Sequence, residues 1–448
     1  MTYDLVVLGA GPGGYDCACE AAELGLKVAL VEKDKVGGTC LNWGCVPTKL
    51  FLGATHAVEE LAGQARIKVA SGEIRVDFAA LQKRKEKLLA GTRKAMIQRL
   101  GFLGVEYVEG PGRIVSPGAV EVRTEVGDET LHYRKLVVAT GSRPIFFPGM
   151  EPDGKAVLDS NMFLDLEAMP ESLVVIGAGF IGLEMAQAAH RFGAKIHVVD
   201  AMDRVAPAEH PEVSKALQSM FKRWKWDVRT GVRVASVKTV DGKAVLTLDS
   251  GDVIEAEKAL VAVGRGPVSD SIGLEQAGVT LERGFIKVDG QLRATDDIYA
   301  IGDVNGMIQL AHAASHQAHY AAMHAAGRTD EPYASGPVPS VLYGAPEAMR
   351  VGRMPSDLKG SDCKVSTFML AANPMAQAHA ATQGFVKVIW SEGRVVGITA
   401  VGHDVSRLTT PSTMIVHASW TRDDIHRIVF PHPSLDEALM GALKAEQK

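Results

Sequence analysis

The chain has 448 residues, 46% of them hydrophobic, and its 48 basic and 53 acidic residues leave a formal net charge of −5. This length is typical of about three domains with buried cores, and the mixed charges indicate neither a nucleic-acid surface nor an acidic tail. We interpret the basic clusters at residues 83–85 and 222–223 as solvated helix faces. No apolar run approaches the roughly 18 residues of a membrane span, and we expect no signal peptide before the strand-like run at residues 3–7. These features predict a cytoplasmic protein.

The N-terminal segment has the order strand, glycine-rich turn, alanine-rich helix, strand. The turn contains Gly9, Gly11 and Gly14, and the second strand ends at Glu32. In such a turn the first glycine allows the tight bend, the second lets the backbone approach a pyrophosphate, and the third permits close helix packing. Glu32 would then accept hydrogen bonds from ribose hydroxyls. The complete unit predicts a dinucleotide-binding site.

Two cysteines, Cys40 and Cys45, follow this unit within residues 37–49. In an ideal helix the Cα atoms of residues i and i+5 are roughly 8.6 Å apart, beyond the roughly 7 Å at which a disulfide closes, so we expect a bend. Gly44 supplies permissive backbone for the bend, and Pro47 can open a regular helix after it. A zinc half-site or two buried thiols remain alternatives, but the adjacent dinucleotide unit favours flavin-linked disulfide chemistry.

The strand, turn, helix and strand pattern recurs further along the chain. Its glycines are Gly177, Gly179 and Gly182, and Asp200 ends its second strand at the same spacing as in the first unit. Two complete units predict two bound dinucleotides. A carboxylate at Asp200 would repel a 2′-phosphate and therefore favours NAD, although Arg204 close by in sequence leaves NADP open.

Two further runs combine a buried-type strand with a turn. Residues 136–144 form a strand and a turn at which the chain could leave one sheet for another. Residues 298–303 repeat the design and place Asp303 at a strand end, where ligands of parallel sheets bind. Asp303 is thus a candidate ribose or ribityl ligand.

Near the C-terminus, His432 lies between two prolines, and Glu437 follows it. Only a thiolate attacks a disulfide, and a thiol of pKa near 8.5 is only about 3% ionised at pH 7, so disulfide chemistry requires a base. Histidine can take that proton. A histidine between prolines is otherwise more often a turn residue.

Together these blocks resemble the pyridine nucleotide-disulfide oxidoreductases over essentially the whole chain, and within that family the dihydrolipoamide dehydrogenase branch. The blocks are the two glycine fingerprints and residues 37–49, 139–141, 263–265, 300–303 and 432–437.

The resemblance implies which residues hold the cofactors FAD and NAD. Those near FAD would be Gly9, Gly11, Gly14, Glu32, Gly38, Thr39, Lys49, Gly112, Thr140, Gly141, Ser142, Asp303, Leu310, Ala311 and His312. Gly112 would lie near the adenine, and residues 310–312 would back onto the pyrimidine end of the flavin at a helix start. The remaining cofactor residues would be Gly177, Gly179, Gly182, Glu184, Asp200 and Gly264, with Glu184 paired to Lys49.

The resemblance also implies catalytic roles. Cys45 would face the flavin, Cys40 would exchange with the substrate, His432 would be the base and Glu437 its orienter. The base would cross to the other chain of a two-fold homodimer. The substrate would be a dihydrolipoyl group, free or on a lipoyl carrier protein or multienzyme complex, and no nucleic-acid or membrane partner is expected.

Departures from the family pattern leave the substrate open. Gln309 and Phe430 replace a common methionine and a common second histidine, and residues 344–347 and 401–409 also differ. An NAD(P)H-dependent reductase of another small disulfide or persulfide is the first alternative. A non-catalytic flavin-bearing scaffold or redox sensor is the second, which the complete catalytic set disfavours.

The predicted fold class is α/β, with two Rossmann-like domains and a C-terminal α+β dimerisation domain. The predicted FAD domain begins with residues 1–148. An NAD domain at 149–265 interrupts it, and the FAD domain continues at 266–335. The predicted dimerisation domain follows at 336–448. We expect no metal site, because no acidic or cysteine residue accompanies the helically spaced His312, His316 and His319. We interpret the other cysteines as packing residues or a lone thiol; they are Cys17, Cys19 and Cys363.

Overall fold

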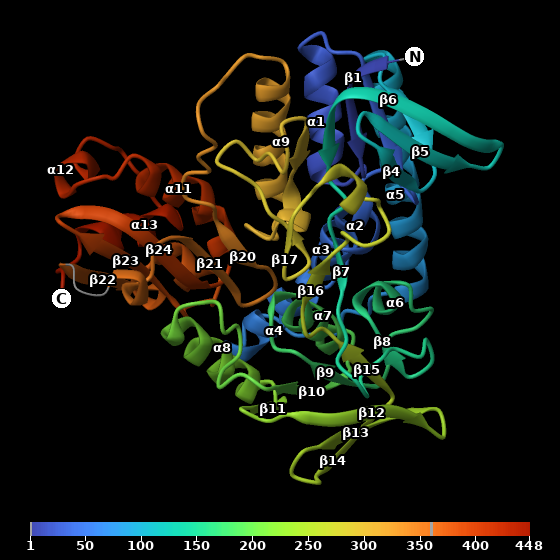
Figure 1. The fold of residues 1–448 in the computed structure, drawn as a ribbon. Helices are drawn as coiled ribbons and strands as arrows, with labels where there is room; N and C mark the ends of the chain where they lie inside the picture. The colour runs from blue at the N-terminus through green and yellow to red at the C-terminus, as the bar shows by residue number, and fades with distance from the viewer. Residues whose placement is uncertain (1, 359–361) are drawn as a thin grey trace. The chain divides into compact units, whose positions relative to one another are not determined.

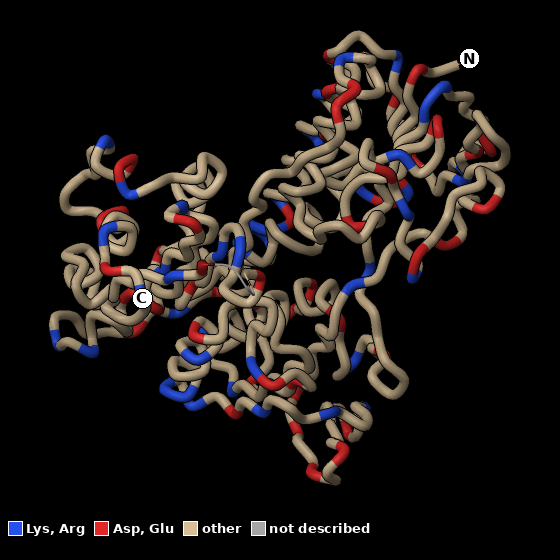
Figure 2. The backbone as a smooth tube through the Cα atoms, turned by 60° about the vertical axis from the view of Figure 1, so that its left-hand side comes forward, with Lys and Arg blue, Asp and Glu red and all other residues tan. Residues whose placement is uncertain are grey.

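The computed structural model describes residues 2–358 and 362–448. The chain divides into two compact units. The first unit comprises Met1–Pro47, Gln82–Ile145 and Arg265–Ser335, and the second comprises Thr48–Leu81, Phe146–Gly264 and Gly336–Lys448. None of the helices in the described part of the chain is both long and apolar enough to cross a membrane. Basic and acidic residues alternate along the backbone without large blocks of one sign (Figure 2).

A parallel sheet forms the centre of the first unit. Its strands are β3 (Glu106–Glu109), β2 (Val28–Glu32), β1 (Thr2–Leu8), β6 (Gly127–Val138) and β19 (Ile298–Ala300), in that order. Strands β2 and β19 are completely buried, as expected for parallel strands covered on both faces. The antiparallel strands β5 (Ala119–Thr124) and β4 (Gly112–Ser116) extend the sheet beyond β6 (Figure 1).

The helices of the first unit pack on this sheet through small side chains. Helix α1 (Pro12–Glu23) lies against α9 (Ala311–Ala325), and Arg99 of the long α5 (Phe78–Phe102) donates to Glu23 Oε1 of α1 at 3.0 Å. Cys17 and Cys19 are buried in this core, consistent with packing residues, and burial raises the pKa of the Cys17 thiol.

The basic cluster at residues 83–85 is only partly a solvated helix face, unlike our interpretation of the sequence. Lys83 and Arg84 of α5 are exposed, but Lys85 is buried and its Nζ lies 3.4 Å from Glu86 Oε1. Successive helical residues point in directions about 100° apart, so three in a row cannot share one face. Lys222 and Arg223 are both exposed in α8 (Pro211–Arg223), as expected.

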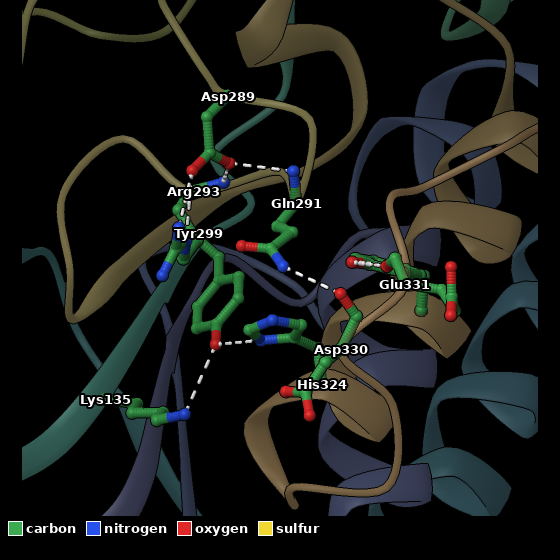
Figure 3. Close-up of polar contacts among 9 residues, drawn as sticks. Lys135, Asp289, Gln291, Arg293, Tyr299, His324, Asp330 and Glu331 are labelled. Carbon is green, nitrogen blue, oxygen red and sulfur yellow. Dashed lines mark hydrogen bonds and ion pairs between the residues drawn. The ribbon is translucent and has the colours of Figure 1, made fainter.

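A network of polar contacts around the buried Tyr299–His324 pair ties α9 to the sheet of the first unit (Figure 3). The hydroxyl of Tyr299 in β19 lies 2.7 Å from His324 Nδ1 near the end of α9, and Lys135 Nζ donates to the same hydroxyl at 3.4 Å. Gln291 Nε2 donates to Asp330 O at 2.9 Å and holds the segment that follows α9. The network anchors the C-terminal end of α9.

The second unit contains another parallel sheet, which repeats the design of the first. Its order is β11 (Asp227–Thr230), β10 (Lys195–Asp200), β9 (Ser172–Ile176), β15 (Lys258–Val261) and β8 (Val157–Leu158). Helix α7 (Phe180–Arg191) connects β9 to β10 and packs on both strands. An antiparallel sheet adjoins it, formed by β12 (Val234–Val240), β13 (Lys243–Leu248) and β14 (Val253–Ala256).

The C-terminal part of the second unit is an antiparallel sheet with helices packed on it. The order is β20 (Ser340–Leu342), β21 (Glu347–Gly352), β24 (Arg394–Gly402), β23 (Phe385–Ser391) and β22 (Cys363–Met369). The helices against it are α11 (Thr409–His417) and α13 (Asp436–Lys444). Trp390 fills the core and donates to Ser366 Oγ at 2.8 Å. The fold class is therefore α/β with an α+β C-terminal part, which confirms the prediction.

Candidate active site

The first glycine turn has the shape that a pyrophosphate requires. Gly9 adopts φ +100°, where a Cβ would collide with the carbonyl of Ala139. A Cβ on Gly14 would overlap the carbonyl oxygen of Gly9, whereas one on Gly11 would meet no atom within 4 Å. Packing therefore requires glycine at positions 9 and 14, whereas Gly11 leaves open space beside its backbone at the start of α1.

Glu32 fixes this turn from the end of β2. The Glu32 carboxylate accepts hydrogen bonds from Ala10 N at 2.6 Å and from Asp34 N at 2.9 Å. Burial raises the pKa of Glu32, and the two N–H donors oppose that shift. The sequence predicted a ribose ligand at Glu32, and the structure adds that this carboxylate also holds the glycine turn.

The second glycine turn has the same construction. Cβ atoms on Gly177 and Gly182 would overlap backbone carbonyls, whereas one on Gly179 would meet no atom within 4 Å. Asp200 ends β10 and accepts from Ala178 N at 2.5 Å and from Met202 N at 2.7 Å. The second unit thus provides a dinucleotide site built like the first.

Arg204, the residue that kept NADP binding possible, contacts residues of its own loop. Its Nη2 donates to Pro207 O at 2.9 Å, and its Nη1 lies 3.5 Å from Asp203 Oδ1. The guanidinium is therefore already bound within its own loop, which favours NAD over NADP.

Asp303 belongs to a hydrogen-bonded group in the first unit. Ser142 Oγ donates to Asp303 Oδ2, and Arg265 contacts the same Oγ at 2.7 Å and Ser142 O at 2.6 Å. Thr140 Oγ1 donates to Val268 O at 2.5 Å. The structure thus brings together two predicted flavin residues, Ser142 and Asp303, and adds Arg265, for which the sequence predicted no role.

Buried Gln317 positions the turn that carries Asp303. Its Oε1 accepts from Gly302 N at 2.7 Å and from Asn305 Nδ2 at 2.9 Å. Gln317 was not predicted from the sequence, because α9 carries several other polar residues and nothing in the sequence separates Gln317 from them. Leu310 is the N-cap residue of α9, so the predicted helix start at residues 310–312 is confirmed.

Gly112 and the α9 histidines have additional contacts. A Cβ on Gly112 would lie 2.8 Å from Leu8 Cδ2, so the start of β4 packs closely on the end of the Leu8 side chain. His319 contacts Glu20 of α1, which corrects the premise that no acidic residue accompanies these histidines. The two residues are distant in sequence and become neighbours only when α1 packs on α9.

The cysteine segment is bent where the sequence predicted it. Helix α2 (Gly38–Trp43) carries Cys40, α3 (Cys45–Ala54) begins at Cys45, and Gly44 between them adopts φ −141° and ψ −108°. Cys40 is half-buried and Cys45 is exposed. The second helix begins two residues before Pro47, because proline is tolerated in a first turn whose N–H groups have no partner within the helix.

Close backbone packing places this segment against the first glycine turn, and Asn42 holds the start of the segment in position. A Cβ on Gly38 would lie 2.7 Å from Gly11 Cα, so the backbones of these residues approach closely. Asn42 Nδ2 donates to Gly38 O at 2.9 Å, and Arg93 Nη1 donates to Asn42 Oδ1 at 2.8 Å. The cysteine segment therefore starts beside the turn suited to the pyrophosphate. Asn42 is a positioning residue that the sequence analysis missed.

Lys49 and Glu184 pair as predicted. Lys49 Nζ lies 2.7 Å from Glu184 Oε2, and Tyr343 N donates to the other carboxylate oxygen at 3.0 Å. Glu184 is buried in α7, which raises its pKa, whereas Lys49 lowers it.

His432 and Glu437 also lie together. His432 Nδ1 is 2.9 Å from Glu437 Oε1, and Ser434 N donates to Glu437 Oε2 at 3.0 Å. Both contacts lower the pKa of the Glu437 carboxyl. A carboxylate on Nδ1 selects the tautomer whose Nε2 can accept a proton, and the His432 side chain is 72% exposed. This pair belongs to the second unit, whereas Cys40 and Cys45 belong to the first.

Two dinucleotide sites with a cysteine pair beside the first define a flavin-linked disulfide oxidoreductase. The sequence matches the family described as pyridine nucleotide-disulphide oxidoreductase over residues 3–318 and its dimerisation domain over residues 338–443. The chain belongs to this family. It is an oxidoreductase whose cofactors are FAD and NAD, and the two accessible glycine turns fit their pyrophosphates.

Individual relatives cover the whole chain. The chain is 35% identical to the dihydrolipoyl dehydrogenase of Bacillus subtilis, with 100% of this chain and 98% of the relative covered. It is 36% identical to that of Chlorobaculum parvum, with 98% and 96% covered. Among solved structures, LpdA of Mycobacterium tuberculosis is 28% identical with a TM-score of 0.91 and 98% of each chain covered. The HOCl-induced flavoprotein disulfide reductase RclA of Escherichia coli is 25% identical with a TM-score of 0.87, covering 98% of this chain and 99% of RclA.

Proposed function

We propose that the chain is a dihydrolipoamide dehydrogenase, which oxidises dihydrolipoyl groups with NAD as the final acceptor. The observation that carries this proposal is the His432–Glu437 pair at 2.9 Å, because oxidation of a dithiol by a disulfide needs a base. The full-length relatives named dihydrolipoyl dehydrogenase support the choice of substrate.

The proposed steps use four side chains. His432 Nε2 accepts a proton from one thiol of the dihydrolipoyl group while Glu437 holds the ring through Nδ1. The thiolate attacks Cys40 Sγ, the bond between Cys40 and Cys45 breaks, and Cys45 leaves as a thiolate. The second substrate thiol, deprotonated in turn, displaces Cys40, so the lipoyl group leaves oxidised and the cysteine pair holds its two electrons. Bound FAD would supply the two-electron chemistry that links the cysteine pair to NAD.

Two groups of residues in the first unit are proposed to hold FAD. One is the glycine turn with Glu32 and the segment that begins at Gly38 and Thr39, and the other is the Ser142–Asp303–Arg265 group, at the turn that Gln317 of α9 supports. Gly264 and the second glycine turn with Asp200 serve NAD.

We further propose that the protein is a homodimer in which His432 serves the cysteine pair of the other chain. The matched dimerisation domain supports this arrangement. A mixed dimer of one Cys40→Ser chain and one His432→Ala chain tests it. If the base acts in trans, one site carries both defects and the other is intact, so activity approaches half of the wild-type value. A nearly inactive mixed dimer of chains that bind FAD and pair normally would refute the shared site.

Steady-state turnover with dihydrolipoamide and NAD tests the substrate. The expected kcat lies in the usual enzymatic range of about 1–1,000 s⁻¹. The altered stretch at residues 401–409 favours the second candidate, a reductase of another small disulfide or persulfide. The second candidate would be established if FAD-loaded protein reduces such a disulfide with NADH but does not oxidise dihydrolipoamide. Inactivity in both assays would indicate a non-catalytic scaffold.

A further inference from the structure

Histidines and carboxylates from distant parts of the sequence meet in the second unit. Glu60 lies in α4 (His56–Arg66), His379 follows α10 (Pro374–Ala378), and His403 follows β24. His403 Nε2 is 3.2 Å from Glu60 Oε1, and one ligand atom from each of the three residues lies within 4.8 Å of the others. None of the three has a role in the proposed reaction.

The distances suit a tetrahedral metal ion. With metal–ligand bonds of about 2.1 Å, ligand atoms of a tetrahedral site are about 3.4 Å apart. Glu60 and His403 are already close to that separation, and the exposed side chain of His379 can rotate to bring its ring nitrogen to the same distance. Two imidazoles and one carboxylate are a ligand set for zinc and its neighbours among the divalent transition metals.

Two further side chains lie beside the three candidate ligands. Asp404 pairs through Oδ2 with Arg407 Nη2 at 3.2 Å, while its Oδ1 lies 3.8 Å from His403 Nε2. The ring of His56 stacks on His403 with centroids 5.9 Å apart, which limits rotation of the ligating ring.

A cavity of about 230 Å³ adjoins the cluster. His379, His403, Asp404, Pro433 and Ser434 are among the residues that line it. The cavity has room for a water molecule as a fourth ligand. An ion here would join α4 to the segments next to Ser434.

We propose that Glu60, His379 and His403 bind a divalent transition-metal ion of the zinc type at the edge of this cavity. The site goes beyond the proposed oxidoreductase function and does not depend on it. It crosslinks α4 to the loop after α10 and the loop after β24, all within the second unit.

Zinc binding to the FAD-loaded protein tests the proposal. Titration calorimetry with Zn²⁺ is done in a Cys40→Ser/Cys45→Ser background, so that the redox thiols do not bind the ion. We expect one Zn²⁺ per chain, a rise in the unfolding temperature with zinc, and affinity at least about tenfold weaker in either His379→Ala or His403→Ala.

His319→Ala is the matched control, because it removes an exposed histidine of α9 in the first unit. His379 is also exposed, so His379→Ala is expected to fold normally, which the flavin spectrum and the unfolding temperature in EDTA verify. The proposal is overturned if the background protein binds no Zn²⁺ at micromolar concentrations. It is equally overturned if both ligand variants keep the full affinity, or if the His319→Ala control is the variant that loses it.

Discussion

Replacing Asp200 tests the cofactor choice of the second dinucleotide site. The Asp200 carboxylate accepts Ala178 N at 2.5 Å and Met202 N at 2.7 Å, so two backbone donors hold it at the end of β10. A carboxylate held in this way cannot turn away from a 2′-phosphate. Arg204, which could neutralise the phosphate, is bound to Pro207 O at 2.9 Å.

The size of the effect follows from Coulomb's law. Two unit charges about 4 Å apart interact by about 4 kcal/mol at an effective dielectric constant of about 20. Asp200 is half-buried, and solvent screening reduces this repulsion to about 2 kcal/mol. That free energy corresponds to about 30-fold, so we expect NAD to exceed NADP in kcat/KM by at least about tenfold.

The assay is steady-state kcat/KM with NAD and with NADP at low and high salt. Asp200→Ala is expected to reduce the ratio of kcat/KM with NAD to kcat/KM with NADP by at least about tenfold. High salt should also reduce this ratio in the wild type, because it screens the repulsion. Glu255→Ala is the matched control, since it removes an exposed carboxylate of β14 in the same unit with the same change of charge. Equal efficiencies for the two cofactors in the wild type, or the same narrowing in Glu255→Ala, would refute the reasoning.

Three further substitutions test other contacts. Lys49→Met leaves the buried Glu184 carboxylate without its cation and is expected to cost about 2 kcal/mol at neutral pH. Burial raises the pKa of Glu184, and losing Lys49 raises that pKa further. The loss of unfolding free energy in Lys49→Met should therefore shrink as the pH falls and the carboxyl becomes protonated. Urea unfolding at about pH 5 and about pH 8 checks whether the loss is smaller at the lower pH. Glu437→Gln should lower kcat by at least about tenfold with little change in KM or FAD content, because the amide cannot stabilise the protonated His432 ring; an unchanged kcat would remove Glu437 from the mechanism. Tyr299→Phe should cost about 1–3 kcal/mol in denaturant unfolding, because it leaves its buried histidine partner unsatisfied, and a wild-type midpoint would contradict this.

The sequence by itself determined the features whose causes are local. The glycine turns are readable because residues such as Gly9 and Gly177 adopt positive φ against a neighbouring backbone, and only glycine fits there. The bend at Gly44 was predicted from the geometry of one helix turn, and the structure has it. The pairing of Lys49 with Glu184 came from resemblance and is confirmed.

Only the tertiary structure decided which distant residues meet. Gln317 supports the Asp303 turn because α9 packs beside β19, and Arg265 reaches Ser142 because β16 (Arg265–Pro267) pairs with β7 (Ser142–Pro144). The same holds for Glu60 and the two histidines beside it, which come from three separate segments of the second unit. Local periodicity and spacing carry no information on such contacts, because they depend on how helices and strands pack after each has formed.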